Sequence, residues 1–450
     1  MEKKNTWETY SSKQLKELEK INAQYRDFLD NGKTERECID TIVNTIEKSG
    51  YRELESLIKE GAALKTGDKV YSVWMNKSIA MFQIGRKPMT DGMNILGAHI
   101  DSPRLDVKQN PLYEDGGFAY LDTHYYGGVK KYQWVTIPLA IHGVIVKKDG
   151  TCVEINIGEN EDDPVFFVSD LLIHLAQEQM EKKAAKVIEG EALDIIVGNK
   201  PLLIDKKDKK KDEKEAGKEA VKAGVLDILK ETYDIHEEDF VSAELEIVPA
   251  GKAREAGFDR SMTLAYGQDD RVCAYTSMQA MLDSDVTDRT MCCILVDKEE
   301  IGSVGATGMQ SHFFENAVAE VMNLAGEYSE LNVRRCLAHS CMLSSDVSSA
   351  FDPTYASSFD KKNVAYLGGG MVINKFTGAR GKSGSNDANA EYLAHLRHIF
   401  DKAEVNFQTA ELGKVDLGGG GTIAYILALY GMNVIDSGVA VLNMHAPWEA

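Results

Sequence analysis

The spacing of apolar residues changes along the chain, and each change predicts a different kind of element. Near the start, apolar side chains such as Leu18 and Tyr25 recur at helical spacing, which predicts a helix. The pattern Thr34-x-x-Glu37 forms a capping box, so a second helix begins there and ends near Gly50. Strand-like apolar runs then follow at 70–75, 79–84 and 93–98.

Between residues 106 and 249 the pattern becomes typical of an antiparallel sheet. Apolar and polar residues alternate over 132–146 and 152–157, and the turn at 148–150, Lys-Asp-Gly, is a hairpin signal between them. A helix is expected over about 168–187, still within this β-rich stretch.

The pattern after residue 250 alternates short apolar runs with helical segments. Such alternation of β and α implies an α/β fold, in which a sheet carries helices on both faces. The expected elements are helices at 272–282, 313–324 and 386–400, and strands at 291–296, ending near 346, at 432–435 and at 439–444.

Length and pattern together predict the domain organisation. At 450 residues the chain is too long for one small core and suits two domains, one inserted into the other. We expect one domain made of 1–105 and 250–450, interrupted by a β-rich domain at 106–249. Within the latter, a run of mixed charges at 205–218 predicts a solvated loop rather than a basic binding patch.

Composition restricts the class of protein. The hydrophobic fraction of 43% and the charged fraction of 27% are ordinary for a soluble globular chain. A formal net charge of −20, without a basic and aromatic cluster, argues against nucleic acid as a partner. The first residues lack an apolar export signal, and no run of 18 apolar residues is present, so we expect a cytoplasmic protein without membrane contact.

Cysteine usage bears on metal chemistry. The seven cysteines are scattered, mostly in apolar segments, and form no C-x-x-C pair, so reduced core thiols are expected. Any metal must therefore be held by histidine and carboxylates.

Adjacent carboxylates follow the apolar run at 291–296. Glu299 and Glu300 would repel one another at the end of a buried strand unless a cation binds one of them and the other acts as a general base. Taken alone, a solvated turn is the simpler interpretation. Other metal-competent residues also follow apolar runs, where ligands collect in open α/β sheets: His99, Asp101, Asp269, Asp270, Asp346 and His445.

A site of histidines and carboxylates without cysteine suits Zn²⁺, Co²⁺ or Mn²⁺. A carboxylate that bridges two such cations would let them act together on one water molecule and on the leaving group. A further carboxylate must then remain available as the base.

These segments, in this order, resemble those of the M18 metallo-aminopeptidases, the group that contains aspartyl aminopeptidase and yeast-type aminopeptidase I. The likeness runs through both halves of the chain. It rests on Gly97-Ala98-His99-Ile100-Asp101-Ser102-Pro103-Arg104-Leu105, Gln268-Asp269-Asp270-Arg271-Val272, Asp297-Lys298-Glu299-Glu300-Ile301-Gly302-Ser303, Ser345-Asp346-Val347 and Asn443-Met444-His445-Ala446.

The resemblance implies a mixed-sheet metallopeptidase fold that binds two divalent ions, with zinc first and cobalt or manganese as alternatives. His99 and Asp346 would hold one ion, Glu300 and His445 the other, and Asp270 would bridge them. Asp269 stands next to Asp270, so the choice of bridging residue is ambiguous by one position.

The remaining catalytic roles are also implied by the resemblance. Glu299 would be the general base that takes a proton from the attacking water and passes it to the departing amine. Asp101 would orient a metal ligand. Peptides with a free N-terminus are the expected substrates.

The sequence indicates less about the preferred substrate side chain and about the oligomeric state. Lys375 and Lys382 lie in a Gly-containing loop. The resemblance implies that a basic residue of this loop contacts an acidic P1 side chain in aspartyl aminopeptidases. Because this stretch departs from the aspartyl type, we expect a neutral or broad P1 preference. The resemblance further implies that the inserted domain dimerises, that His174 enters a neighbour's active site, and that dimers form a dodecamer.

Other interpretations remain open at this point. A related hydrolase of N-acyl amino acids would need a similar metal site, and a non-catalytic assembly protein could keep the same fold. The sequence ends at Ala450, five residues after His445, where similar chains are expected to continue with a further helix.

Overall fold

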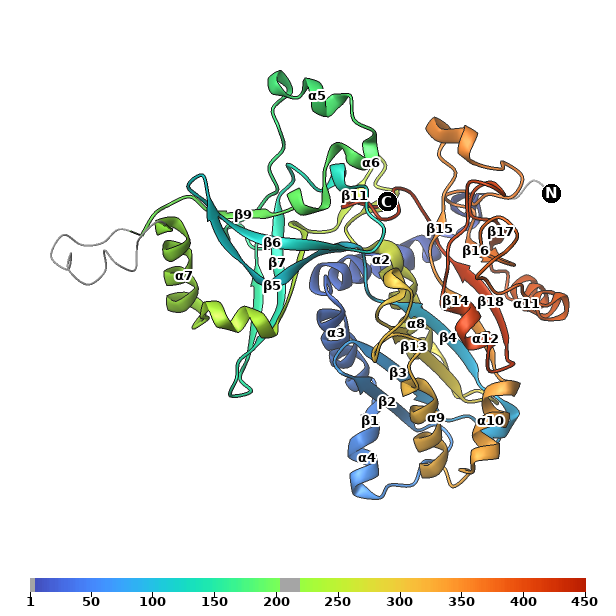
Figure 1. Ribbon diagram of the computed structural model, residues 1–450. Helices are drawn as coiled ribbons and strands as arrows, with labels where there is room; N and C mark the ends of the chain where they lie inside the picture. The colour runs from blue at the N-terminus through green and yellow to red at the C-terminus, as the bar shows by residue number, and fades with distance from the viewer. Residues whose placement is uncertain (1–4, 203–218) are drawn as a thin grey trace. The chain divides into compact units, whose positions relative to one another are not determined.

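A computed structural model describes residues 5–202 and 219–450 (Figure 1). The run of charges expected to form a loop at 205–218 lies outside these described residues. The chain divides into two compact units, with unit 1 made of Met1–Ser102, Ala253–Met444 and Glu449–Ala450, and unit 2 made of Pro103–Lys252 and His445–Trp448.

Unit 1 is organised around a nine-stranded sheet. In spatial order its strands are β1 (Arg52–Glu53), β2 (Lys69–Trp74), β3 (Ser78–Gln83), β13 (Met291–Val296), β4 (Asn94–His99), β14 (Cys341–Ser345), β18 (Asn433–Gly438), β16 (Met371–Asn374) and β17 (Phe407–Thr409). The four central strands, β13, β4, β14 and β18, run parallel to one another, whereas β3 is antiparallel to β13 and β16 is antiparallel to β18. The sheet is therefore mixed, as predicted.

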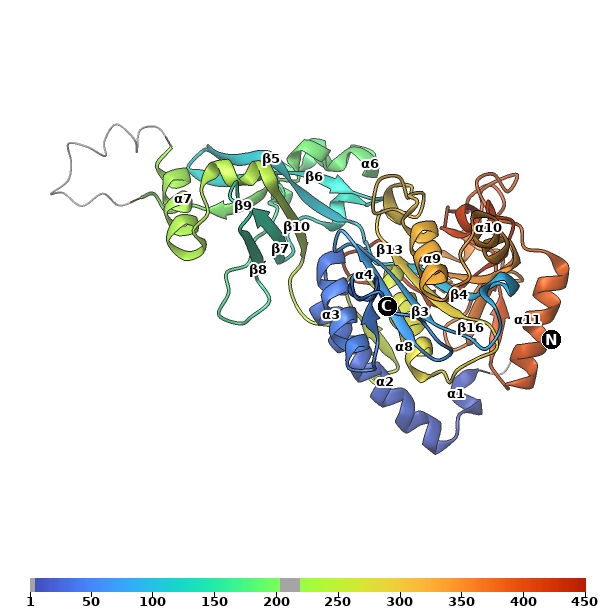
Figure 2. The same cartoon turned by 90° about the horizontal axis from the view of Figure 1, so that it is seen from below.

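Helices cover both faces of this sheet, which confirms the predicted α/β architecture (Figure 2). One face packs against α4 (Leu54–Glu60), α9 (Phe313–Leu324), α10 (Glu330–His339) and α12 (Ala424–Ala428). The other packs against α2 (Ser12–Asn31), α3 (Glu35–Glu47) and α8 (Gln268–Asp283), with α11 (Ala390–Lys402) beside β16 and β18 and the short α1 (Thr6–Thr9) at the start of the chain.

The apolar run at β13 shows why the sheet lies between two helical layers. Cys292 and Ile294 face one hydrophobic cluster, whereas Cys293 and Leu295 face the other. Successive side chains of a strand point to opposite faces, so a continuous apolar run is stable only when both faces are covered.

The predicted capping box is also present. The side chain of Thr34 accepts a hydrogen bond from the backbone N–H of Glu37, and α3 begins at the intervening Glu35. All seven cysteines are free thiols, and five of them are buried, as expected for a reduced chain.

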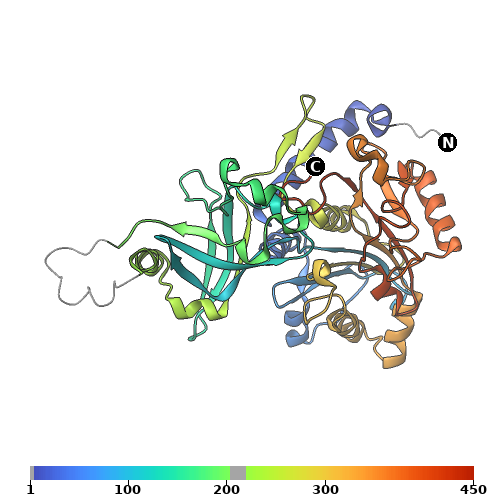
Figure 3. The same cartoon turned by 45° about the horizontal axis from the view of Figure 1, so that its top comes forward.

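Unit 2 contains a six-stranded antiparallel sheet (Figure 3). Its strands, in spatial order, are β8 (Cys152–Ile157), β7 (Leu139–Val146), β10 (Ala243–Pro249), β5 (Arg104–Asp115), β6 (Phe118–Tyr126) and β9 (Ile195–Gly198), with α7 (Ala220–Tyr233) packed on β5, β6 and β9. The predicted hairpin joins β7 to β8, where Val146 pairs with Cys152.

Two predicted elements were wrong. Instead of one helix over 168–187 there are three short pieces, η3 (Ile173–Leu175), α5 (Gln177–Met180) and α6 (Ala184–Val187). The apolar side chains of this segment are mostly exposed, so no packed face sustains a longer helix.

The expected closing strand at 439–444 is only the two-residue β19 (Ala440–Val441). It pairs with β15 (Ser348–Ser349) in a separate two-stranded ladder. The chain leaves extended geometry soon afterwards, since Asn443 has φ of +61°.

The remaining short elements connect these parts of the chain. They are η1 (Met89–Asp91), η2 (Lys131–Gln133), η4 (Gly190–Ala192), η6 (Glu237–Ser242), β11 (Arg254–Ala256), β12 (Met262–Leu264), η7 (Glu299–Ile301) and η8 (Pro353–Ser358). Among residues 5–202 and 219–450, no helix combines the length and apolar character that a bilayer crossing requires.

Candidate metal centre

Chemistry-bearing residues gather where the central parallel strands of unit 1 end. His99 is the last residue of β4 and pairs in register with Val296, the last residue of β13. Glu299 and Glu300 lie in η7 directly after β13, and Asp346 directly follows β14. Since the carboxyl ends of parallel strands share one sheet edge, the fold brings these segments together.

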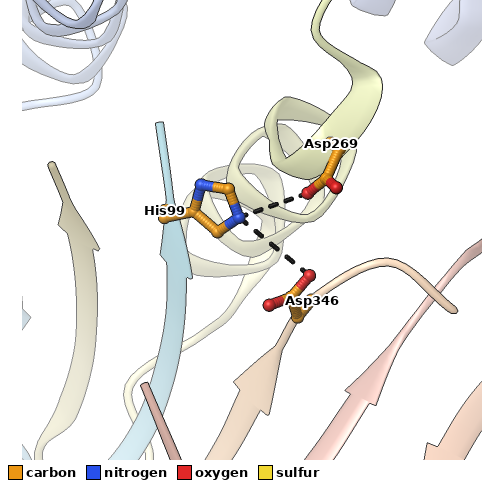
Figure 4. Close-up of side chains that lie close together, drawn as sticks. All are labelled: His99, Asp269 and Asp346. Atoms are coloured by element: carbon orange, nitrogen blue, oxygen red, sulfur yellow. Dashed lines mark ion pairs between the residues drawn. The ribbon is translucent and has the colours of Figure 1, made fainter. Parts of the chain in front are cut away.

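His99 is the centre of a compact cluster. Its Nε2 lies 3.2 Å from Asp269 Oδ1 and 4.0 Å from Asp346 Oδ1. Figure 4 shows the side chains of Asp269 and Asp346 directed at the His99 ring. The three residues offer nitrogen and oxygen ligand atoms that all lie within 4.8 Å of one another. His99 and Asp269 are buried, and Asp346 is largely so. This geometry is compatible with a single cation between them.

Asp269 is held in place by contacts to its backbone. The Ser102 hydroxyl donates to the Asp269 carbonyl at 2.6 Å, and the Asp269 N–H donates to Glu449 Oε2 at 2.9 Å. Both residues are buried, so the start of α8 is anchored from two separate segments of unit 1. Glu449 was not anticipated from the sequence, and no motif there marks it.

The neighbouring Asp270 lies differently. Its Oδ2 accepts the backbone N–H of His99 at 3.4 Å, and its side chain also interacts with the Cys273 thiol. Asp270 belongs to none of the groups of clustered metal-competent residues, whereas Asp269 belongs to two of them. Of the two adjacent aspartates, Asp269 is therefore the one whose carboxylate lies next to His99 Nε2.

Asp101 connects His99 to the paired glutamates. Its Oδ1 accepts the backbone N–H of Glu299 and its Oδ2 that of Glu300, each at 3.1 Å. His99 Nδ1 lies 3.0 Å from the Asp101 carbonyl and 3.2 Å from its Oδ1, and both of these oxygens are acceptors. Nδ1 therefore carries a proton, and Nε2 is the atom directed at Asp269 and Asp346.

A second group lies next to the first. Asp269 and Glu300 offer oxygen atoms within 4.8 Å of one another, which places Asp269 beside both candidate ion positions. Glu299 is close as well, with Oε2 at 3.9 Å from His99 Nε2. His445 belongs to unit 2, where its Nδ1 lies 2.8 Å from the Gly128 carbonyl.

The electrostatics of the cluster fit a bound cation. Burial raises the pKa of Asp346 well above its usual value, and the charges of Asp270 and Asp269 raise it further. Burial alone lowers the pKa of His99, but hydrogen bonds to Asp101 and Asp269 raise it overall. Several buried carboxylates are unfavourable together unless a positive charge compensates them. The imidazole and carboxylate donors match those of zinc sites.

The predicted substrate-binding residues lie on other elements of the two units. Lys375 and Lys382 lie in the loop after β16, and their side chains are about half exposed. His174 is exposed on η3 in unit 2.

A family model described as Aminopeptidase I zinc metalloprotease (M18) matches residues 28–450. The probable M18 family aminopeptidase 1 of Clostridium acetobutylicum is 63% identical over 448 residues, covering 100% of this chain and 94% of that one. The protein of the same name from Thermotoga maritima is 44% identical over 450 residues, covering 100% and 95%.

Solved structures agree with this comparison. The M18 aminopeptidase of Thermotoga maritima superposes with a TM-score of 0.93 at 44% identity, covering 100% of this chain and 95% of that chain. Aminopeptidase I of Clostridium acetobutylicum gives a TM-score of 0.90 at 60% identity, with the same coverage.

Fold and site together define a metallopeptidase with an α/β catalytic unit. The chain belongs to the M18 family of metal-dependent aminopeptidases, hydrolases that remove N-terminal residues from peptides. This membership favours the peptidase interpretation over an N-acyl amino acid hydrolase or a non-catalytic assembly protein.

Proposed function

We propose that the protein is a two-metal aminopeptidase in which Asp269 would be a ligand shared by both ions. His99 and Asp346 would be the other protein ligands of one ion. Glu300 and His445 would be the other protein ligands of the second ion. The observation that carries the proposal is the position of Asp269. One of its carboxylate oxygens lies within 4.8 Å of ligand atoms of His99 and Asp346, and a carboxylate oxygen also lies within 4.8 Å of a ligand atom of Glu300. Asp269 thereby replaces Asp270 in the bridging role expected from the sequence.

The tautomers of both histidines support this assignment. His99 Nδ1 donates to Asp101, so a cation that displaced the proton from Nε2 would bind the lone pair of that nitrogen. In unit 2, His445 Nδ1 donates to the Gly128 carbonyl, so its Nε2 likewise presents a lone pair. Zinc is the first choice for imidazole and carboxylate donors without thiolate, and cobalt or manganese could replace it.

Residues of the chain would transfer the proton and hold the base and the ligand in position. Bound zinc ions would supply Lewis acidity that favours deprotonation of a water and polarises a carbonyl. Glu299, partly exposed beside the cluster, accepts the proton of the attacking water and returns it to the departing amine. Asp101 holds the backbone of Glu299 and Glu300 so that base and ligand keep their relative positions.

The proposed substrates are peptides with a free N-terminal amine and a neutral side chain at P1, with broad tolerance. The match to the aminopeptidase I model and the departure of the loop at 374–382 from the aspartyl type support this preference. An acidic P1 side chain, recognised by Lys375 or Lys382, is the second possibility.

Self-association of unit 2 is part of the same proposal. Ile173 and Leu175, on either side of His174, are each 68% exposed, and Leu171 and Leu172 next to them are exposed as well; a contiguous exposed apolar run of this kind is typical of an interaction surface. We propose that a second copy covers this segment, that His174 then reaches the neighbour's active site, and that such dimers form a dodecamer.

The experiment that tests the activity compares matched peptides with a free and an acetylated N-terminus. A chelator should abolish hydrolysis of the free peptide, and added Zn²⁺ should restore it, with Co²⁺ and Mn²⁺ assayed in parallel. Hydrolysis that survives chelation would contradict a metal mechanism, and a preference for the acetylated peptide would indicate an N-acyl amino acid hydrolase instead.

A further inference from the structure

The side chain of Arg271 folds back over the turn that carries Asp269. Arg271 is only 1% exposed, and its Nη2 donates to the Lys33 carbonyl, between α2 and α3, at 2.9 Å. Gly267 lies on the other side of this turn with φ of +71°, a conformation that glycine adopts readily. A Cβ atom added at Gly267 would lie 1.8 Å from Arg271 Nη1. The guanidinium therefore fills the space that a side chain at position 267 would need.

This contact restrains the backbone that sets the direction of the Asp269 carboxylate. Asp269 and Asp270 have non-helical dihedral angles, and helical geometry resumes at Arg271. Ser102 and Glu449 hold the backbone of Asp269 itself. The guanidinium lies against the residue that precedes the irregular stretch, so it closes the turn from a third direction.

Arg271 also places a positive charge near the carboxylates behind the site. Burial alone lowers the pKa of Arg271, but Cys38 and other neighbours, among them Glu35, raise it overall. Glu35 is buried and has an oxygen within 4.8 Å of oxygens of Asp101 and Asp297. Asp101 in turn holds the backbone N–H groups of the paired glutamates. The guanidinium thus offsets part of the negative charge that these buried carboxylates bring together.

We propose that Arg271 is a positioning residue for the metal centre, which holds the turn so that the Asp269 carboxylate faces both candidate ion positions. The inference rests on the proposed two-metal function and extends it to a residue that has no metal-ligand atom of its own. The alternative is a purely structural role. A buried charge costs free energy, and an apolar side chain of similar size would fill the same space without that cost.

The test disturbs one contact from its two sides. Arg271→Met removes the guanidinium, and Gly267→Ala places a Cβ atom against it. Purified zinc-loaded protein is dialysed against graded EDTA concentrations. The concentration that removes half of the zinc should fall about 10–100-fold in both variants, as expected when a group that orients a ligand is lost. Gly61→Ala is the matched control, because Gly61 has a similar φ of +65° but no atom within 4 Å of its Cβ position. Its zinc retention should equal that of the parent.

The double variant separates positioning from a general loss of stability. If Gly267→Ala acts by displacing the guanidinium, adding it to Arg271→Met should cost little further zinc affinity. Arg271→Lys, which keeps the charge but not the planar fork, replaces Arg271→Met if the latter does not fold.

Parent-like zinc retention in the folded variants, an equal loss in Gly61→Ala, or fully additive losses would overturn the inference. Failure of every variant at positions 267 and 271 to fold would indicate a purely structural role and overturn it as well. Failure of the two-metal proposal would look different, because the parent itself would then bind no zinc or would hydrolyse peptides without it.

Discussion

The buried carboxylate of Asp101 accepts the backbone N–H of Glu299 at 3.1 Å. The other oxygen of the same carboxylate accepts from Glu300, also at 3.1 Å, and its Oδ1 lies 3.2 Å from His99 Nδ1. One side chain therefore fixes the proposed base, one proposed ligand from each candidate ion site, and the tautomer of the histidine.

Replacing Asp101 with Asn should weaken both metal binding and turnover. The amide has one acceptor oxygen instead of two and would turn an N–H group towards another donor. We expect a loss of about 10–100-fold in metal affinity or kcat, the range seen when a group that orients a ligand is removed. Metal content and steady-state kinetics measure these effects, and Asp149→Asn, which affects a backbone hydrogen bond in the β7–β8 turn, is the control. Parent-like kinetics and metal affinity would contradict this role.

The adjacent aspartates can be separated experimentally. Asp269→Asn should reduce metal content and activity far more than Asp270→Asn, because Asp269 directs its oxygen at His99 Nε2 whereas Asp270 accepts the His99 backbone N–H. Elemental analysis of the purified variants provides the measurement. Loss of metal in Asp270→Asn with metal retained in Asp269→Asn would restore the assignment expected from the sequence.

The sequence predicted the strand ends of the site but not the choice between these neighbours. His99 and Asp346 end or follow apolar runs, and a buried strand can be predicted from such a local apolar run alone. Whether Asp269 or Asp270 faces the histidine depends on the backbone before α8, where both residues have non-helical dihedral angles. Those angles are maintained by the distant Ser102 and Glu449, which no local pattern reveals.

The mispredicted helix at 168–187 has a related cause. Its apolar residues occur at spacings compatible with a helix, but whether a helix persists depends on a surface against which to pack. Within the described residues of one chain, Ile173 and Leu175 remain exposed.

Exposure of this segment gives a prediction about assembly. Leu175→Asp should weaken self-association without unfolding the chain, because a charge placed at a self-association interface would be desolvated. Leu429→Asp is the matched control, since Leu429 is 81% exposed at the end of α12 in unit 1. Sedimentation velocity should show smaller species for Leu175→Asp alone. The same assembly in both variants would exclude this segment as the interface.

Asp436 predicts a pH dependence of stability. Burial raises its pKa to about 7, and its Oδ2 has no hydrogen-bond partner among the described residues. Because the folded pKa exceeds that of an unfolded Asp, this group's stabilising contribution is present below about pH 4 and is lost as pH rises through about 7. Asp436→Asn removes the titration.

The corresponding measurement is urea unfolding of parent and variant at about pH 5 and about pH 8. The free energy of unfolding of the parent should fall relative to Asp436→Asn by up to about 3 kcal/mol across this interval. An equal difference at both pH values would show that Asp436 does not titrate there in the folded protein.

The most direct test of the two-metal mechanism is the Glu299→Gln variant, which keeps the shape of the side chain and the backbone hydrogen bond to Asp101. As the proposed base, Glu299 should contribute about 10²–10⁴-fold to turnover, so kcat for a neutral aminoacyl substrate should fall by that factor. Zinc content measured on the same preparation should match the parent. Activity within about tenfold of the parent, with full metal content, would contradict the assignment of Glu299 as the general base.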